Sequence, residues 1–291
     1  NPSVAVVADE NLAESCYKVF RQSDCDTEIK AGRAALEEVA ADTRVDIVVA
    51  AIVGSVGLNS AMAAAKTGKR ILLANKEALV MSGELFMKEA FHSGSTIIPI
   101  DSEHSGIFQC LSHTASGLNV AQFEDIEKLV LTASGGPFLH LPFSDFKNIT
   151  PEMACAHPTW KMGKKISVDS ASMMNKGLEL IEAHHLFGLD VTRIDAIIHP
   201  QSVVHAFVHF LDGSVLSQLS NPDMKIPIAY GLSYPRRMET GVQRLKLTEL
   251  TELEFLEIDE DRFPCLKLGR LAAEEGGSSP IVLNAANEVA L

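Results

Sequence analysis

The first hundred residues alternate between apolar runs typical of buried strands and amphipathic stretches typical of helices. Strands are expected at residues 4–8, 45–50, 70–74 and 96–100, and helices at residues 12–21, 31–41, 60–67 and 77–91. Alternation at this spacing requires βαβ crossovers, which place the strands in a mostly parallel sheet with helices on both faces. The sequence therefore predicts a doubly wound α/β architecture for this part.

The composition argues against two classes of partner. The net charge is −13 and no basic face of consequence can be identified, so no nucleic-acid partner is expected. No apolar run approaches the roughly 20 residues that span a bilayer, so no membrane partner is expected either. The cysteines are widely scattered without Cys-x-x-Cys spacing, which predicts free thiols in a cytosol-like compartment and no zinc site.

Both ends of the sequence look cut. The chain starts at Asn1 directly before a strand-like run, and it stops at Leu291 inside a helical pattern. No initiator Met, signal peptide or transit peptide is visible. We therefore expect a sequence truncated at its N-terminus and a cytoplasmic location, with a plastid location left open.

Two carboxylates follow the strand expected at residues 96–100. Asp101 and Glu103 are spaced i and i+2 at its carboxyl end, where open α/β sheets bind ligands. Carboxylate oxygens suit Mg²⁺ or Mn²⁺. The alternative is a solvated turn in which Asp101 caps the next helix.

Segments with possible ligand-binding residues follow three other expected strands. Residues 51–57 contain Gly54 and Gly57, whose backbone a ligand can approach closely, and Asn75 begins a helix after the next strand. Residues 134–136, Ser-Gly-Gly, expose a hydroxyl and backbone donors that suit a phosphate oxygen. Ordinary turns remain the alternative at each place.

A single helix is expected from a cap at Asp169 or Ser170 to Gly188. On it, Asn175 and Glu179 are spaced i, i+4, and Lys176 and Glu179 are spaced i, i+3, so both pairs share a face. Ser170, Asn175 and Lys176 could hold a phosphate while Glu179 completes a metal site, or Lys176 and Glu179 could be a surface ion pair.

The loop-like residues 157–165 contain Trp160 between prolines, glycine and lysines, which indicates either a mobile flap over an anionic substrate or a Trp packed at a domain interface. Further along, a strand is expected at residues 195–199, followed by a hairpin that pairs residues 202–210 with residues 214–220. Met224, in the turn after the hairpin, is either core filler or a lid contact. The stretch at residues 248–261, which is rich in acidic residues, suggests a connecting segment before further helices.

At this point the motifs identify a family. The sequence resembles the 1-deoxy-D-xylulose 5-phosphate reductoisomerases at residues 73–77 (LANKE), 101–104 (DSEH), 133–138 (ASGGPF), 157–163 (HPTWKMG), 169–179 (DSASMMNKGLE), 199–202 (HPQS) and 222–224 (PDM). The resemblance implies conversion of 1-deoxy-D-xylulose 5-phosphate to 2-C-methyl-D-erythritol 4-phosphate in non-mevalonate isoprenoid biosynthesis. The implied cofactors are NADPH and Mg²⁺ or Mn²⁺, with Co²⁺ as a further option, and a homodimer is implied.

The resemblance also implies a domain plan. It predicts a truncated Rossmann-like NADPH-binding domain at residues 1–100, an α+β catalytic domain at residues 101–238, a connecting segment at residues 239–262 and the start of a C-terminal helical domain at residues 263–291. Family members carry a Gly-rich dinucleotide loop upstream of Asn1, which this sequence does not contain.

Carried over by motif, the resemblance implies three sets of site residues. The metal ligands are Asp101, Glu103 and Glu179, and the catalytic residues are Lys76, Glu103 and His157. The substrate is expected to contact Ser102, Glu103, Ser134, His157, Trp160, Met162, Ser170, Asn175, Lys176 and Glu179. The cofactor is expected to contact Ala51, Ile52, Val53, Gly54, Asn75, Lys76, Glu77, Gly163 and Met224.

Two other functions fit the same residues. One is a truncated, catalytically silent fragment that binds a metal ion and a phosphosugar. The other is a metal-dependent phosphosugar isomerase or aldolase without a redox step. Consumption of NADPH distinguishes the reductoisomerase from both.

Overall fold

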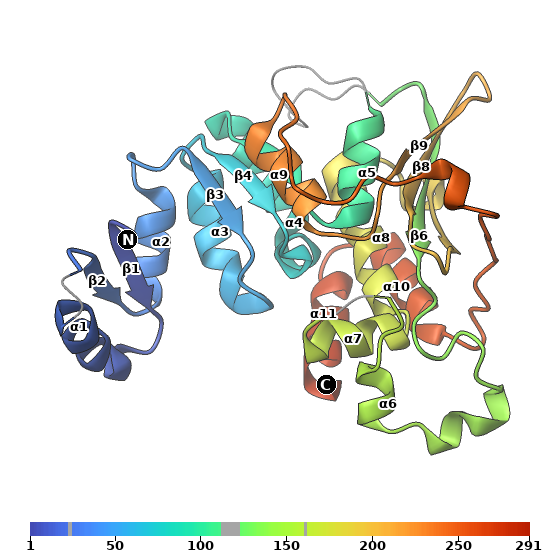
Figure 1. Ribbon diagram of the computed structural model, residues 1–291, viewed down its shortest axis with the longest axis horizontal. Coiled ribbons are helices and arrows are strands. Elements are labelled where there is room, and N and C mark those ends of the chain that lie inside the picture. The colour runs from blue at the N-terminus through green and yellow to red at the C-terminus, as the bar shows by residue number, and fades with distance from the viewer. Residues whose placement is uncertain (23–24, 112–122, 160–161) are drawn as a thin grey trace.

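The computed structural model describes residues 1–22, 25–111, 123–159 and 162–291 of the chain (Figure 1). The strands are β1 (Val4–Val7), β2 (Glu28–Ala31), β3 (Ile47–Ala50), β4 (Arg70–Leu73), β5 (Thr96–Pro99), β6 (Ile126–Ala133), β7 (Ile194–Ile198), β8 (Val204–Phe210) and β9 (Val215–Leu219). The α-helices are α1 (Ala13–Gln22), α2 (Arg33–Ala41), α3 (Leu58–Ala65), α4 (Lys76–Ser93), α5 (Ser102–Cys110), α6 (Pro151–Cys155), α7 (Lys164–Ala171), α8 (Met174–Phe187), α9 (Lys225–Ser233), α10 (Pro264–Glu275) and α11 (Ser279–Ala290).

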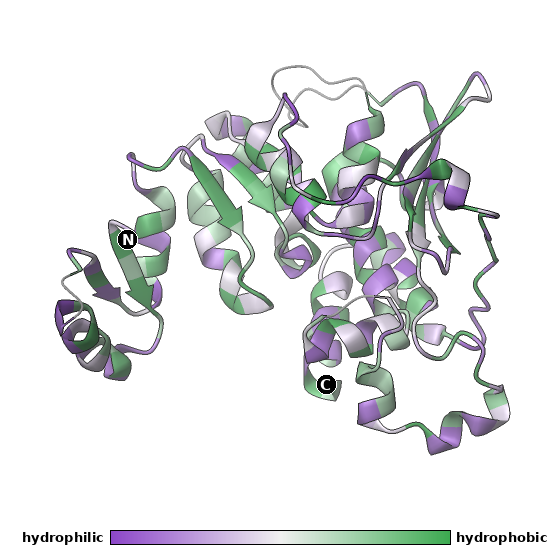
Figure 2. Ribbon diagram, in the orientation of Figure 1, coloured by the Kyte–Doolittle hydropathy of each residue, from purple (hydrophilic) through white to green (hydrophobic). Residues whose placement is uncertain are grey.

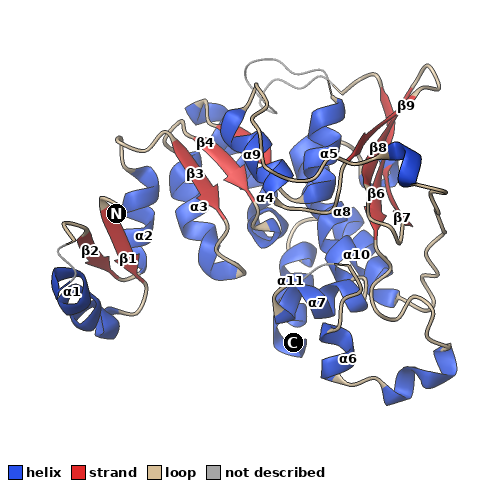
Figure 3. Cartoon of the chain, in the orientation of Figure 1, coloured by secondary structure: helices blue, strands red, loops and turns tan. Residues whose placement is uncertain are grey.

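The first hundred residues form parallel sheets with helices between the strands, as predicted (Figure 3). Strands β1 and β2 pair with each other, and β3, β4 and β5 form a second sheet in that order. Figure 2 shows β3 and β4 as largely hydrophobic, as expected for strands covered on both faces. The α/β fold class is therefore confirmed.

Strand β2 was not expected, and the helix predicted from residue 31 starts later. Ala31 is the last residue of β2, where it lies opposite Val7 of β1. Gly32 then turns the chain with a φ of 85°, and α2 begins at Arg33. Because β2 has only four residues, two of them charged, the sequence pattern gave no strand signal.

The carboxyl ends of β3, β4 and β5 lie at one edge of their sheet. Ala50 is in register with Leu73, and Leu73 with Pro99. The segments that follow these residues carry the expected cofactor loop at residues 51–54, the residues 75–77 and the carboxylates of residues 101–103. Parallel pairing thus brings three predicted site segments to the same crevice.

The second half of the chain is built on a mixed four-stranded sheet in the order β7-β6-β8-β9. Strands β6 and β7 are parallel, whereas β8 pairs antiparallel with β6 and β9, which confirms the predicted hairpin. Helix α9 was not expected, since the sequence suggested only a turn around residues 221–224.

The single helix predicted from Asp169 to Gly188 is wrong at its start. The chain forms α7 from Lys164 and a separate α8 from Met174, with Met173 between them in the left-handed region at a φ of 64°. The predicted end is confirmed, because Gly188 adopts a φ of 61° directly after α8. The break places Asn175 and Lys176 in the first turn of α8 instead of mid-helix.

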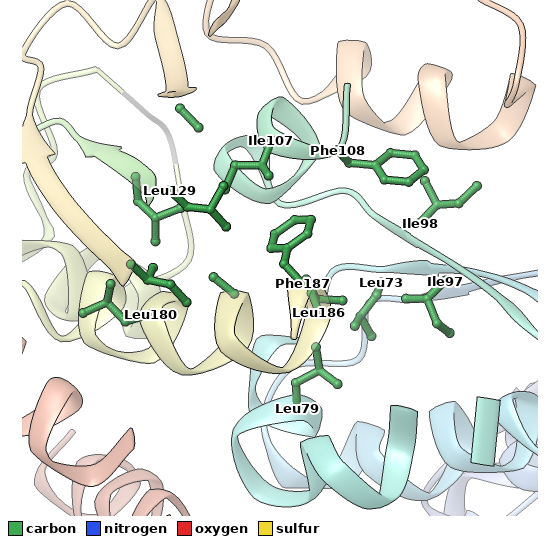
Figure 4. Close-up of a cluster of buried hydrophobic side chains, with 14 of the residues drawn as sticks. Leu73, Leu79, Ile97, Ile98, Ile107, Phe108, Leu129, Leu180, Leu186 and Phe187 are labelled. Carbon is green, nitrogen blue, oxygen red and sulfur yellow. The ribbon is translucent and has the colours of Figure 1, made fainter. Parts of the chain in front are cut away.

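One hydrophobic core joins the two sheet systems. Figure 4 shows Leu73, Leu79 and Ile97 of the first system close to side chains of α5, β6 and α8, namely Ile107, Phe108, Leu129, Leu180, Leu186 and Phe187. Burial of this apolar surface fixes the end of β5 relative to α8. The carboxylates that follow β5 therefore face those on α8.

No helix in the described ranges combines the length and apolarity that a membrane span requires.

Candidate active site

Three carboxylates converge at the end of β5. Asp101 precedes α5, Glu103 lies in its first turn and Glu179 lies on α8. One oxygen of each lies within 4.8 Å of the others. The Asp101 side chain makes no capping hydrogen bond to α5, so the alternative of a helix-capping turn is not what the structure has. An all-oxygen donor set of this size fits Mg²⁺ or Mn²⁺.

Two buried lysines balance these carboxylates. The Lys76 ammonium lies 2.5 Å from Asp101 Oδ2 and 2.8 Å from Glu179 Oε1, and it also donates to Asn175 Oδ1 at 2.9 Å. The Lys176 ammonium lies 2.6 Å from Glu103 Oε1 and 2.5 Å from Glu179 Oε2. The side chains of Lys176 and Glu179 are 4% and 1% exposed. The alternative of a surface ion pair is therefore wrong, although the predicted helical spacing is correct.

The carboxylates differ in their pKa values. Burial, together with the nearby negative charge of Glu179, raises the pKa of Glu103 to about 7. Burial acts in the same direction on Asp101, but the Lys76 ammonium outweighs it and holds the pKa of Asp101 below its usual value. Burial also opposes ionisation of Glu179, whose pKa the Lys176 and Lys76 charges nevertheless lower. Asp101 and Glu179 are thus ionised at neutral pH, whereas Glu103 titrates near it.

A buried histidine connects the two helices that carry the carboxylates. His104 of α5 is hydrogen-bonded through Nε2 to the main-chain oxygen of Glu179 at 3.0 Å, and its Nδ1 lies 3.4 Å from Glu182 Oε2. His104 and Glu182 are fully buried, and burial raises the pKa of Glu182 to about 7. The sequence analysis did not predict this pair. The sequence offered two signals for it, a histidine directly after Glu103 and a glutamate three residues after Glu179.

A pocket of about 240 Å³ opens beside the carboxylates. The pocket is lined by the expected metal ligands, by most of the expected substrate residues and by two expected cofactor residues: Lys76, Asp101, Ser102, Glu103, Ser134, His157, Met162, Ser170, Asn175, Lys176, Glu179 and Met224. Trp160 lies outside the described residues. The structure therefore brings together segments from residue 76 to residue 224 of the chain.

Another part of the pocket lining carries hydroxyl and imidazole groups. Ser134 Oγ and His157 Nε2 share a hydrogen bond of 2.9 Å. Ser134 Oγ also accepts a hydrogen bond from the Gly136 main-chain nitrogen at 3.2 Å. Burial lowers the pKa of His157, so this imidazole favours its neutral form. Neutral imidazole can both accept and donate a hydrogen bond to a substrate hydroxyl.

Three further polar residues line the pocket that were not among the expected site residues: Thr132, Ser202 and His205. Ser202 has a φ of 52°, a conformation that non-glycine residues rarely adopt and that clusters at functional sites. His205 is hydrogen-bonded to Ser220 Oγ at 2.8 Å, and burial lowers its pKa to about 4. Ser202 stands in the motif at residues 199–202, which was the only sequence signal for it.

The remaining expected cofactor residues lie along the adjoining edge. Ala51, Ile52 and Val53 are exposed after β3. Asn75 caps α4 by accepting from the Ala78 main-chain nitrogen at 2.9 Å, and its amide donates to the Ile52 and Gly54 carbonyl oxygens. One side chain thus ties the loop after β3 to the start of α4. Glu77 follows in the first turn of α4, and Gly163 precedes α7.

Family models match most of the chain. Residues 1–83 match 1-deoxy-D-xylulose 5-phosphate reductoisomerase, residues 97–187 match its C-terminal domain, and residues 219–291 match the DXP reductoisomerase C-terminal domain. The chain is 53% identical to the 1-deoxy-D-xylulose 5-phosphate reductoisomerase of Vesicomyosocius okutanii and 54% identical to that of Pseudomonas savastanoi pv. phaseolicola. Each match covers 100% of this chain and 73% of the relative.

Solved structures of the same family are also similar to this chain. A DOX-P reductoisomerase in complex with NADPH, fosmidomycin and magnesium superimposes with a TM-score of 0.95 at 50% identity, over 99% of this chain and 71% of that one. The enzyme from Zymomonas mobilis in complex with NADPH gives a TM-score of 0.89 at 42% identity, over 99% of this chain and 72% of that one. On the evidence of its site, its sequence relatives and its fold, the chain belongs to the 1-deoxy-D-xylulose 5-phosphate reductoisomerase family.

Proposed function

We propose that the protein converts 1-deoxy-D-xylulose 5-phosphate to 2-C-methyl-D-erythritol 4-phosphate with NADPH and a divalent metal ion. The observation that carries this proposal is the single pocket in which three carboxylates, two lysines and a serine-histidine wall converge. Such a pocket can hold a small anionic sugar with its reacting carbons beside the carboxylates. Mg²⁺ and NADPH are bound by the similar structures, and we assign both to this chain.

Asp101, Glu103 and Glu179 are our proposed metal ligands. When bound there, the ion supplies Lewis-acid activation of the substrate's ketone and hydroxyl oxygens, and NADPH supplies the hydride. Lys76 contacts two of the proposed ligands, Asp101 and Glu179, and lies beside the cofactor edge. We therefore assign its positive charge to offset those carboxylates between the metal site and the cofactor edge. Glu103 also lines the pocket beside Ser102, and we assign it to receive the proton of a substrate hydroxyl next to the ion.

The phosphate end of the substrate is assigned to the far side of the pocket. Ser134 and Ser170 present hydroxyl groups there, and His157 is hydrogen-bonded to Ser134. We assign Asn175 to the phosphate as well, from the carboxylate side of the pocket, where it is hydrogen-bonded to Lys76 and Glu179. The Lys176 ammonium contacts Glu103, Glu179 and the Thr132 carbonyl oxygen, so it adds positive charge between the phosphate and the carboxylates. Ser102, at the start of α5, is assigned to the sugar hydroxyls.

Met162 and Met224 line the pocket together with His157. We propose that residues 157–163, including Trp160, close over the substrate as a flap. Rearrangement by carbon-carbon cleavage and rejoining produces two fragments that must not diffuse apart, and the aldehyde must meet hydride before water. Closure of this segment would hold the fragments and exclude water.

The nicotinamide cofactor is assigned to the edge formed by residues 51–54, Asn75, Lys76, Glu77, Gly163 and Met224. This edge adjoins the pocket at Lys76 and Met224, so a hydride donor there reaches the substrate.

The domain plan of residues 1–100, 101–238, 239–262 and 263–291 remains our proposal. It places the cofactor edge mainly in the first domain.

We also propose a homodimer in the cytoplasm. Strand β9 stands at the edge of its sheet among the described residues, and Val215 and Leu216 on it are 47% and 48% exposed. An unpaired edge strand with exposed apolar residues can pair with the same strand of a second copy of the chain. Sedimentation should give twice the chain mass, and Leu216→Arg should give the monomer.

The cytoplasmic location is supported by the cysteines. All five are unpaired, which fits a reducing compartment.

The test is NADPH oxidation, followed by absorbance, with 1-deoxy-D-xylulose 5-phosphate and Mn²⁺. We would assay this polypeptide and one extended at both ends with the flanking regions of a relative. Equal amounts of product and oxidised NADPH support the proposal. Product without NADPH oxidation would indicate an isomerase or aldolase, and binding without turnover in both chains would indicate a silent binding protein.

A further inference from the structure

Lys165 connects three helices that are far apart in the sequence. It is the second residue of α7, and its ammonium donates to Glu77 Oε1 of α4 at 2.9 Å and to Asp169 Oδ2 of α7 at 2.9 Å. The same ammonium lies 3.4 Å from Glu288 Oε1 of α11. Figure 1 shows α7 and α11 side by side near the C-terminus. One cation is thus shared by carboxylates from three elements.

The network around Lys165 is largely shielded from solvent. The side chains of Glu77 and Asp169 are 8% and 3% exposed, and that of Lys165 is 21% exposed. Asp169 uses its second oxygen, Oδ1, to accept a hydrogen bond of 2.8 Å from Asn287 of α11. The pocket lining does not include Lys165, so it has no assigned role in substrate binding.

This network borders the cofactor edge on two sides. Glu77 lies two residues after Asn75, which holds the loop at residues 51–54. On the other side, Glu288 lies against that loop, because a Cβ built on Gly54 would come within 3.7 Å of its carboxylate. Gly163, just before α7, ends the segment that we assign to the flap. Lys165 is therefore placed where the flap, the cofactor loop and the C-terminal helix meet.

We propose that Lys165 is a positioning residue for the cofactor, which holds the Glu77 carboxylate at the cofactor edge and ties the flap-bearing helix α7 to α4 and α11. The inference rests on the proposed function, since it assumes that NADPH occupies this edge. It assigns Lys165 no contact with the substrate or the metal ion. A role through Glu77 predicts a selective effect on NADPH.

The physical reason is charge. Without the ammonium, Glu77, Asp169 and Glu288 would face one another with no cation between them in a partly desolvated site. A buried carboxylate that loses its partner is strongly destabilised, so Glu77 would turn toward solvent. An exposed ion pair would lack this effect, because water screens it. The cofactor edge would then lose its shape while the carboxylate pocket stays intact.

The first experiment compares Lys165→Met with Lys164→Met. Both variants remove a lysine charge from the first turn of α7, but Lys164 is exposed and has no hydrogen bond or ion pair to any residue that the structure describes. We expect Lys165→Met to raise the KM for NADPH about tenfold, with KM for the phosphosugar and the Kd for Mn²⁺ within about twofold of wild type. Lys164→Met should change none of the three.

The second experiment asks whether Lys165 acts through Glu77. Glu77→Gln should raise the KM for NADPH, and the KM of the double variant Lys165→Met/Glu77→Gln should be no higher than that of Glu77→Gln alone, because Lys165 acts on the cofactor edge through Glu77. Lys165→Arg should restore the KM to within about threefold of wild type, since a guanidinium supplies enough donors for the same carboxylates. A KM for NADPH measured in this way is informative only if folding is preserved, which thermal melting of each variant checks.

Three results would overturn the inference. The first is an equal rise in the KM for NADPH and for the phosphosugar in Lys165→Met. The second is an effect of Lys164→Met as large as that of Lys165→Met, and the third is multiplicative effects in the double variant. A wild-type enzyme that turns over substrate without NADPH would refute the proposed function instead, so the two failures are distinguishable.

Discussion

Single side chains in this site depend on partners from distant parts of the chain. Glu179 illustrates this at the residue scale, because its two carboxylate oxygens contact Lys76 and Lys176 separately. Glu179 is fully buried, so any change there alters the balance of two cations and two other carboxylates. A neutral replacement of the same shape isolates the charge from the packing.

Glu179→Gln should lower kcat/KM by at least roughly 100-fold, because an amide is a poorer ligand for a divalent ion than a carboxylate. Circular dichroism should show an unchanged fold, and the Kd for Mn²⁺, measured by electron paramagnetic resonance, should rise. Glu274→Gln, at an exposed position on α10, is the control and should have wild-type kinetics. Unimpaired activity in Glu179→Gln would remove Glu179 from the metal site.

His185 sets a pH dependence of stability. Burial, aided by the neighbouring His184 charge, lowers its pKa to about 4 from 6.5. The unfolded chain therefore binds more protons than the folded one between pH 6.5 and 4, so stability is lost as the pH falls through this window. The loss is about 3 kcal/mol at most, from the size of the pKa shift.

Thermal melting from pH 7 to pH 4 checks this expectation. The melting temperature of His185→Gln should fall less over this range than that of wild type, because glutamine does not titrate. His92→Gln, exposed on α4, is the matched control and should follow wild type. If His185→Gln and wild type show the same slope, the pKa of His185 is not lowered as the structure indicates.

At the scale of elements, close helix contacts decide where functional side chains lie. Helices α8 and α10 meet at Gly177 and Gly269, where a Cβ on Gly269 would come within 2.4 Å of the Gly177 Cα atom. Gly177 is two residues before Glu179, so this contact also fixes the metal ligand. A Cβ at Gly269 therefore cannot be accommodated without a backbone shift, whereas a Cβ at Gly177 would come within 3.0 Å of the Cys265 carbonyl oxygen.

Gly269→Ala should destabilise the protein by roughly 1–3 kcal/mol, because the backbones must separate to accept the methyl group. The same variant should weaken Mn²⁺ binding, since α8 carries Glu179. Chemical denaturation and the Kd for Mn²⁺ measure the two effects. Lys267→Ala, at an exposed position of α10, should stay within about 0.5 kcal/mol of wild type. An unchanged stability of Gly269→Ala would show that the helices lie farther apart.

At the scale of the whole molecule, the metal site is assembled from two parts of the chain. Asp101 and Glu103 follow β5 of the first sheet system, and Glu179 belongs to the helix that covers the second. The shared core in Figure 4 holds these parts together. An ion that binds only the folded arrangement should therefore stabilise the entire structure.

Mn²⁺ at about 100 times its Kd should stabilise the fold by roughly 2.7 kcal/mol, which corresponds to a rise in melting temperature of roughly 4 °C for a chain of this length. Excess chelator should reverse the rise, and Glu179→Gln should not show it. Differential scanning calorimetry measures all three. An identical rise in Glu179→Gln would place the ion elsewhere.

The sequence by itself determined the local elements and the chemistry of the site. Periodicity located β1, β3, β4 and β5 to within a few residues, because strand and helix patterns are local. Motifs supplied most of the residues that line the pocket. Local patterns failed where the backbone departs from them without a glycine or proline signal, as at Met173, whose left-handed conformation splits the expected helix.

Only the tertiary structure decided which charges meet. Lys76 and Glu179 are 103 residues apart, and Lys165 and Glu77 are 88 residues apart, yet each pair forms a direct ion pair. The burial that raises the pKa of Glu103 and leaves His104 against Glu182 likewise arises from helix packing. Residue types are written in the sequence, whereas burial and long-range pairing exist only once the core brings distant segments together, because desolvation and Coulomb energies depend on distance in space.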